Sequence, residues 1–133
     1  MPDKQASKKS RIVVLISGSG SNLQAIIDGC QQQQINAEVA MVISNRPNVF
    51  GLQRAEQAGI ANACIDHKDF ASREAFDQAL SDKLNSINPD LIVLAGFMRI
   101  LTSEFVTNFL GRLVNIHPSL LPKYPGLNTH QRA

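Results

Sequence analysis

The amino-acid sequence predicts an α/β fold: an open, mostly parallel sheet with helices on both faces. Short apolar runs alternate with amphipathic stretches along the chain, which is the pattern of strands joined by helical crossovers. Two of these runs, Arg11–Ile16 and Leu91–Leu94, are almost wholly apolar, as expected of parallel strands that are covered on both faces. The chain has 133 residues, of which 44% are hydrophobic and 18% charged, so it can bury the core of one domain.

The first part of the predicted sheet is the strand at Arg11–Ile16. The segment SGSGS follows it, and a helix is expected from about Asn22 to Gln34. Apolar residues at helical spacing mark the buried side of this helix: Leu23, Ile26, Ile27 and Cys30. Ser21 and Gln24 stand at the spacing of a capping box, which predicts side-chain hydrogen bonds at the start of the helix.

The other elements follow at short intervals. Strands are expected at Val39–Ile43, Ala63–Ile65, Leu91–Leu94 and Leu113–Ile116, and helices at Phe50–Ala58, Ser72–Ser86 and Ser103–Phe109. Numbered along the chain, the strands fit the Rossmann-like order 3-2-1-4-5 with right-handed crossovers. In such a sheet, ligands bind at the carboxyl ends of the strands where the order reverses, which is between the first and fourth strands. The segments after the first, fourth and fifth strands are therefore the candidate ligand-binding segments.

The net charge of +2 comes from the start of the chain. Residues 1–10 hold three of the 13 basic residues and one of the 11 acidic residues, so residues 11–133 are neutral. We expect residues 1–10 to form a disordered tail and residues 11–133 to form the domain. A neutral domain with a single tyrosine does not favour nucleic acid as a partner.

The sequence carries no signal for secretion or membrane insertion. No apolar run approaches the roughly 18 residues of a membrane span, and the first ten residues are polar, unlike a secretory signal. Cys30 and Cys64 lie far apart and form no CxxC pair, so neither a disulfide framework nor a zinc ribbon is expected. These features predict a cytoplasmic protein with no membrane partner.

The segment Ser17–Asn22 joins a buried strand to the start of a helix. Its glycines allow a ligand to approach the backbone, and its hydroxyls, its amide and the first N–H groups of the helix suit a phosphate monoester. A dinucleotide fits less well, because Leu23 stands where GxGxxG needs its third glycine and no acidic residue ends the second strand. The alternative is a tight turn that only requires small residues.

The segment Ala95–Leu101 (AGFMRIL) carries several large apolar side chains and one cation. An apolar wall of this kind can hold a flat heterocycle. The alternative is that these side chains belong to the core, because apolar residues after a buried strand commonly pack inward.

The segment after the fifth strand presents an amide and an imidazole together. Asn115 and His117 lie two residues apart on an extended segment, so their side chains face one side while Ile116 faces the other. An imidazole can transfer a proton near neutral pH, and an amide can donate a hydrogen bond to a developing oxyanion. The alternative is a structural histidine bonded to a loop carbonyl. The spacing of His67, His117 and His130 is not that of metal ligands, so no metal site is expected.

Together these segments closely resemble the phosphoribosylglycinamide formyltransferases. The resemblance runs from about Arg11 to the end of the chain. It rests on VVLISGSGSNLQAII (Val13–Ile27), AGFMRIL (Ala95–Leu101) and NIHPSLLPKYPGLNTHQR (Asn115–Arg132). Methionyl-tRNA formyltransferases and formyltetrahydrofolate hydrolases share the Asn-x-His core, but they differ in the residues that follow it and in the first glycine segment.

The resemblance implies transfer of a formyl group from 10-formyltetrahydrofolate to the amine of glycinamide ribonucleotide in de novo purine biosynthesis. It implies a folate cosubstrate, with no permanently bound cofactor and no metal. Matched residue by residue, Asn115 and His117 are the catalytic pair, while Gly20, Ser21 and Asn22 hold the substrate phosphate. The residues that match the folate site are Arg73, Met98, Arg99, Ile100, Leu101 and Asn115.

The sequence departs from the family pattern in its length. In the family, an aspartate that orients the catalytic histidine matches a position beyond Ala133. We therefore expect a C-terminally truncated formyltransferase fold with an uncovered sheet edge, which favours a homodimer or strand exchange. Two alternatives to an active transferase stay open: a catalytically incomplete fragment that binds a phosphorylated ligand, and another enzyme that uses formyltetrahydrofolate.

Overall fold

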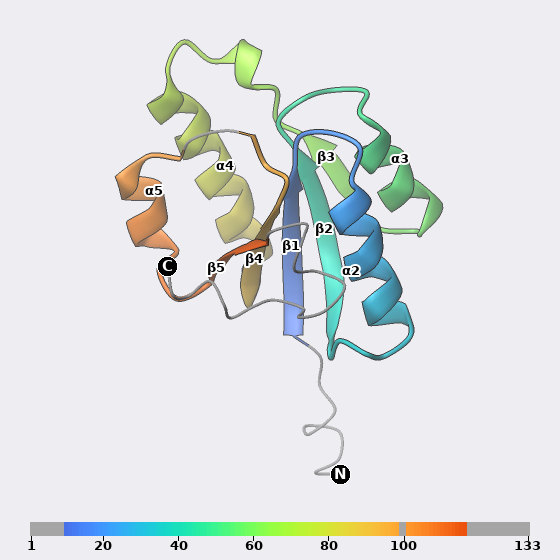
Figure 1. Cartoon of the computed structure of the whole chain (residues 1–133). Coiled ribbons are helices and arrows are strands. Elements are labelled where there is room, and N and C mark those ends of the chain that lie inside the picture. Colours follow the sequence, from blue (N-terminus) through green and yellow to red (C-terminus); the bar gives the residue numbers. More distant parts are fainter. Residues whose placement is uncertain (1–9, 99–100, 117–133) are drawn as a thin grey trace.

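The described part of the chain folds around one five-stranded sheet (Figure 1). The computed structural model describes residues 10–98 and 101–116. The strands are β1 (Ser10–Ile16), β2 (Ala37–Ser44), β3 (Asn62–Cys64), β4 (Leu91–Ala95) and β5 (Leu113–Ile116). Their order is β3-β2-β1-β4-β5, and each neighbouring pair is parallel. The predicted fold class and strand order are confirmed.

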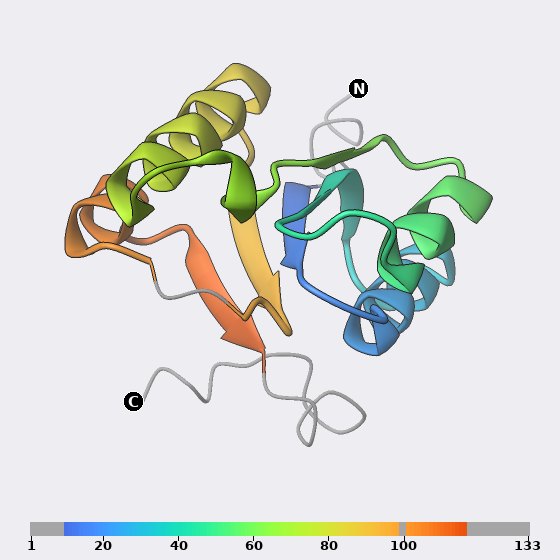
Figure 2. The ribbon, with the colours of Figure 1, turned by 90° about the horizontal axis from the view of Figure 1, so that it is seen from above.

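The described helices cover both faces of the sheet. They are α2 (Ser21–Gln31), α3 (Phe50–Gln57), α4 (Arg73–Ile87) and α5 (Ser103–Asn108), with a 3-10 turn, η1 (His67–Asp69), that lies outside the predicted elements. The helices α2 and α3 lie on one face, and α4 and α5 on the other, as Figure 2 shows from above. None of the described helices has the length and apolar character needed to cross a membrane.

Two predictions about α2 are wrong. The helix begins at Ser21 and ends at Gln31, short of the predicted Gln34, because Gln33 adopts a left-handed conformation with φ of 63°. The predicted capping box is not formed: the N-cap is Gly20, with φ of 78°, and no side chain caps the helix. Of the predicted tail, residues 1–9 lie outside the described residues, and Ser10 is the first residue of β1.

β1 is buried on both faces, as its apolar run predicts. Val14 and Ile16 contribute to the core under α2 and α3, while Val13 and Leu15 contribute to the core under α4 and α5. All four side chains are completely buried. The largest side chains of the second core are Phe76 of α4 and two phenylalanines at α5, Phe105 and Phe109.

The strand register brings the carboxyl ends of the strands to one edge of the sheet. Ile16 of β1 pairs with Ser44, which pairs with Cys64, so β1, β2 and β3 end side by side. Ala95 of β4 likewise pairs with Ile116 of β5, and β4 runs next to β1. Segments that follow different strands therefore leave the sheet at the same edge.

Candidate active site

The glycine segment after β1 lies between a buried strand and α2. Gly20 is buried, Ser21 is exposed and Asn22 is half-buried. The carbonyl of Gly20 accepts the first helical hydrogen bond, from the N–H of Gln24 at 2.8 Å. With glycine at the N-cap, no side chain covers the first N–H groups of α2, and these have no partner inside the helix.

The first residues of α3 pack against this segment. The N–H of Gly51 donates to the Gly18 carbonyl at 3.1 Å, and Arg54 Nε donates to the Ser19 carbonyl at 2.7 Å. The two backbones approach so closely that a Cβ on Gly20 would lie 2.7 Å from the Cα of Gly51. The contact therefore requires glycine at both positions.

Ser17 joins the ends of three strands. Its hydroxyl donates to Asn45 Oδ1, after β2, at 2.6 Å and accepts from the N–H of Met98, after β4, at 2.7 Å. Ser17 and Asn45 are both buried, with 1% and 2% of their surface exposed. The carbonyl of Asn45 in turn lies 3.0 Å from Nδ1 of His67. This network fixes where the connection after β4 leaves the sheet.

The far end of that connection is held by Asp77 of α4. Its Oδ2 accepts from the N–H of Thr102 at 2.7 Å, and Thr102 caps α5 through a bond from the N–H of Phe105 at 3.1 Å. Asp77 is buried, and its Oδ1 has no hydrogen-bond partner among the described residues. The segment between β4 and α5 is thus tied to the fold at two described points.

The apolar residues after β4 divide between the core and the surface. Phe97 and Leu101 are half-buried and pack against the core under α4 and α5. Met98, in contrast, is 77% exposed. The core reading thus holds for Phe97 and Leu101. The exposed side chain of Met98 leaves the predicted ligand wall a prediction. The predicted folate residues Arg99 and Ile100 lie outside the described residues.

The predicted catalytic segment follows the register of β5. Asn115 pairs with Leu94 and is exposed, whereas Ile116 packs against the core under α2 and α3. Their opposite orientations match the predicted alternation. His117 directly follows β5 in the sequence and lies outside the described residues. Arg73 is exposed at the start of α4, which in Figure 1 begins at the same edge where β1 ends.

Comparison with known proteins identifies the family. The sequence profile of formyl transferases matches residues 10–133. The chain belongs to the formyl transferase family. It is 58% identical over 122 residues to the phosphoribosylglycinamide formyltransferase of Escherichia coli, a match that covers 92% of this chain and 58% of that protein.

Other members of the family give the same result. The chain is 58% identical over 130 residues to the trifunctional purine biosynthetic protein adenosine-3 of Drosophila melanogaster, covering 96% of this chain and 10% of that protein. The crystal structure of phosphoribosylglycinamide formyltransferase from Brucella melitensis superposes with a TM-score of 0.80 at 48% identity, over 95% of this chain and 66% of that one. The chain thus spans less than two thirds of the length of these relatives.

Several residues that hold the candidate segments were not predicted. Asn45 contacts Ser17, Arg54 contacts Ser19, and Asp77 contacts Thr102, the residue directly after Ala95–Leu101. Asp77 has a sequence signal, because it is an acidic residue at helical spacing with the buried Leu80 and Leu84. Arg54 has no such signal, because its position beside Ser19 depends on how α3 packs.

The titratable groups near the end of β3 do not form a metal site. Within the described residues, no three His, Cys, Asp or Glu side chains cluster in the manner of metal ligands. Cys64 is exposed at the end of β3. Although the residue is exposed, partial desolvation of its thiol raises the pKa above the ordinary value, and the negative charges of Asp66 and Asp69 raise this pKa further. The thiol is therefore a poor nucleophile at neutral pH.

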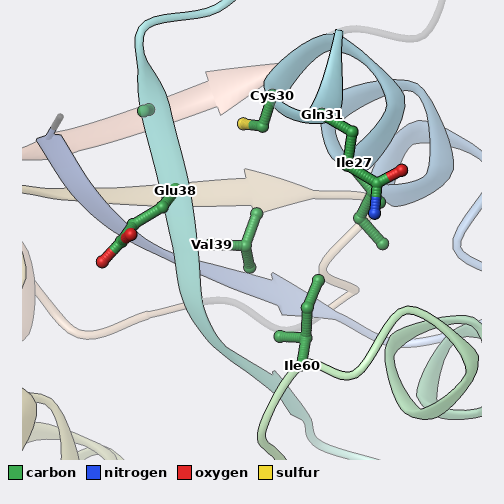
Figure 3. Close-up of a pocket in the computed structure, with 7 residues that line it drawn as sticks. Ile27, Cys30, Gln31, Glu38, Val39 and Ile60 are labelled. Atoms are coloured by element: carbon green, nitrogen blue, oxygen red, sulfur yellow. The ribbon is translucent and has the colours of Figure 1, made fainter. Parts of the chain in front are cut away.

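A separate hollow lies at the opposite edge of the sheet, where β2 begins (Figure 3). It measures about 240 Å³ and is lined by Ile27, Cys30 and Gln31 of α2, by Ala37–Val39 of β2 and by Ile60. None of the predicted site residues lines it. This hollow is therefore distinct from the strand ends at which the candidate segments meet.

Proposed function

We propose that this protein transfers a formyl group from 10-formyltetrahydrofolate to the primary amine of glycinamide ribonucleotide. The observation that carries the proposal is the 58% identity over 122 residues to the Escherichia coli protein named for this formyl transfer. The placement of the segments supports it, since β1, β4 and β5 end at one edge of the sheet and the segments after them can reach one bound pair of substrates.

The phosphate of the ribonucleotide is assigned to Gly20, Ser21 and Asn22. The left-handed Gly20 at the N-cap leaves the first N–H groups of α2 uncovered, and the positive end of the helix dipole favours an anion there. The hydroxyl of the exposed Ser21 adds a further donor. A phosphate monoester is the ligand that such a set of donors suits best.

The folate is assigned to the segment after β4 and its neighbours. The residues are Arg73, Met98, Arg99, Ile100, Leu101 and Asn115. The exposed side chain of Met98 and the half-buried Leu101 supply apolar surface for a flat heterocycle. Arg73 carries a positive charge at the start of α4, which suits a carboxylate of the folate.

The proposed reaction uses Asn115 and His117. The amine nitrogen attacks the formyl carbon, so that a new C–N bond forms and negative charge develops on the formyl oxygen. Asn115 donates a hydrogen bond to this oxygen, and protonated His117 stabilises the charge. The bond from the formyl carbon to the folate nitrogen then breaks. That nitrogen takes a proton from His117, which regains one from the attacking amine.

The test is formyl transfer by the 133-residue chain, with glycinamide ribonucleotide and 10-formyltetrahydrofolate as substrates. We expect His117→Ala and Asn115→Ala each to lower kcat by about 100-fold. Asn85→Ala, at an exposed position of α4, is the matched control and keeps the wild-type rate. A kcat for His117→Ala that stays close to the wild-type value contradicts the assigned mechanism.

A fragment that binds a phosphorylated ligand without catalysis stays the alternative function. A chain that binds a phosphorylated ligand but transfers no formyl group supports the binding-only alternative. Direct binding measurements, made beside the transfer assay, distinguish this alternative from an active transferase.

The outer edge of β5 is unpaired among the described strands, so we infer that it pairs with a second copy, as a homodimer or by strand exchange. Light scattering that finds only monomer at high concentration contradicts this pairing. The cytoplasmic location stays a prediction, which cell fractionation tests.

A further inference from the structure

α3 contacts three consecutive residues of the glycine segment. The N–H of Gly51 donates to the carbonyl of Gly18 at 3.1 Å, and Arg54 Nε donates to the carbonyl of Ser19 at 2.7 Å. At the third residue, Gly20, the backbones are so close that a Cβ would lie 2.7 Å from the Cα of Gly51. α3 therefore holds one side of the segment along its length.

These contacts decide which way the N–H groups of the segment face. The peptide bonds are trans, and in a trans peptide the C=O and the following N–H point in opposite directions. Because the carbonyls of Gly18 and Ser19 point toward α3, the N–H groups of Ser19 and Gly20 point away from it. Successive backbone N–H groups that face outward form an anion-binding surface, and the first N–H groups of α2 extend it.

Three contacts hold the guanidinium of Arg54 in place. Besides the bond to Ser19, Nη1 donates to Gln24 Oε1 of α2 at 3.1 Å. The side chain of Gln24 in turn donates to Asp28 Oδ1 at 2.9 Å. The guanidinium also lies over the ring of Phe50, 4.6 Å from its centroid. The side chain is half-buried, so its charge has a defined position beside the segment.

We propose that Arg54 is a positioning residue for the phosphate group of the substrate. It draws the Ser19 carbonyl toward α3 and so turns the N–H of Gly20 outward. It also places a fixed positive charge beside residues 17–24, which carry no ionisable side chain of their own. Arg54 acts through the segment and not by touching the phosphate. The inference rests on the proposed function, because it takes the glycine segment to bind a phosphate monoester.

The experiment measures binding without turnover. Dissociation constants for inorganic phosphate, glycinamide ribonucleotide and 10-formyltetrahydrofolate are determined by calorimetry or NMR titration. In Arg54→Gln we expect the Kd of both phosphate ligands to rise about tenfold, since a charge-assisted bond is lost. The Kd of the folate changes less than about twofold, since the segment after β4 is held by other residues.

Arg112 offers a matched control. Its guanidinium also lies over a phenylalanine ring, 5.1 Å from the centroid of Phe109, and donates to a carbonyl, that of Pro89, at 3.2 Å. It lies just before β5 begins, at the opposite edge of the sheet from the glycine segment. Arg112→Gln should leave all three dissociation constants unchanged. Arg54→Lys keeps the charge but not the fork of donors, and an intermediate rise of about threefold is expected.

Specific outcomes overturn the inference. A change of less than twofold for phosphate in Arg54→Gln does so, as does an equal loss of phosphate and folate binding. If Arg54→Gln fails to fold, Gln24→Ala replaces it: this variant removes one restraint on Arg54, and a two- to threefold weaker phosphate affinity is expected. A wild type that binds phosphate but transfers no formyl group contradicts the proposed function alone. A wild type that binds neither phosphate ligand contradicts both.

Discussion

The segments that follow β1 and β4 leave neighbouring strands, but the fold holds them in different ways. Gly18–Gly20 is held through its backbone, because α3 donates hydrogen bonds to two of its carbonyls and leaves no room for a side chain at Gly20. The connection after β4 is held by two buried side chains. Ser17 accepts from the N–H of Met98, and Asp77 accepts from the N–H of Thr102.

The difference matches the ligand proposed for each segment. A phosphate needs several N–H groups aimed at one point, and a backbone held by its carbonyls supplies them. A flat heterocycle needs apolar surface, and a segment anchored at both ends by buried acceptors can leave a side chain such as Met98 exposed. Substitutions should therefore act sterically in the first segment and through lost hydrogen bonds in the second.

The largest effect is expected from Gly20→Ala. This variant combines a φ of 78° with a Cβ that would meet the Gly51 backbone, so we expect the free energy of unfolding to fall by about 3 kcal/mol. Gly59→Ala is the matched control, because Gly59 has φ of 74° but nothing within 4 Å of its Cβ. Its expected cost is about 1 kcal/mol. Denaturant unfolding measures both variants. Equal losses in the free energy of unfolding would show that the close contact with α3 adds nothing to the cost of Gly20→Ala.

Ser17→Ala is expected to have the next largest effect. The variant removes the hydroxyl that bonds both the N–H of Met98 and the side-chain oxygen of Asn45 at a buried position. We expect the free energy of unfolding to fall by about 2 kcal/mol. Ser86→Ala, which removes an exposed hydroxyl bonded to the Lys83 carbonyl, should stay within about 0.5 kcal/mol of wild type. Thermal or denaturant unfolding distinguishes them, and similar values for the two would argue against Ser17 as an anchor.

Asp77 provides a finer test of the second segment. In Asp77→Ala the N–H of Thr102 loses its acceptor, and we expect a loss of about 1.5 kcal/mol. Asp77→Asn keeps a carbonyl oxygen at the same place, so its cost should be about 0.5 kcal/mol. If unfolding measurements find the Asn variant as unstable as the Ala variant, the charge of Asp77 matters and not its role as acceptor.

These contacts also explain what the sequence could predict. Apolar runs and helical spacing are local signals, so they predicted the strands, the helices and the buried sides of the helices. The strand order followed from the general rule of right-handed crossovers in such sheets. The glycine segment stood out because small residues between a strand and a helix are a local signal as well. The bonds from Ser17 to Met98, from Ser17 to Asn45 and from Arg54 to Ser19 join residues 81, 28 and 35 positions apart. Such pairings depend on packing, which no local pattern reveals.

The predicted capping box at the start of α2 was wrong for the same reason, a contact between distant parts of the chain. The spacing of Ser21 and Gln24 fits a capping box, but the close approach of Gly51 requires glycine at the N-cap, which has no side chain to cap the helix. Gln24 instead accepts a hydrogen bond from Arg54. A tertiary contact thus overrides a local capping signal at the place where the phosphate is proposed to bind.

The smallest effect is expected at Cys64, which lies outside both segments. Its pKa is raised in the folded state, so the folded protein holds this proton more tightly than the unfolded chain. The resulting stabilisation is present below the ordinary cysteine pKa of about 8.5 and is lost as pH rises through the higher folded pKa. Unfolding measured from pH 7 to pH 10 should show a slight alkaline loss in wild type that Cys64→Ser lacks. An identical pH dependence in both would contradict the raised pKa.

The comparison of the two segments can be tested most directly by NMR. Backbone amide resonances are followed while glycinamide ribonucleotide and then 10-formyltetrahydrofolate are added to the 133-residue chain. We expect the ribonucleotide to shift the amides of Ser19, Gly20, Ser21 and Asn22, and the folate to shift those of Met98 and Leu101. Ribonucleotide shifts confined to other parts of the chain, or one set of shifts common to both ligands, would contradict the division of the site between these two segments.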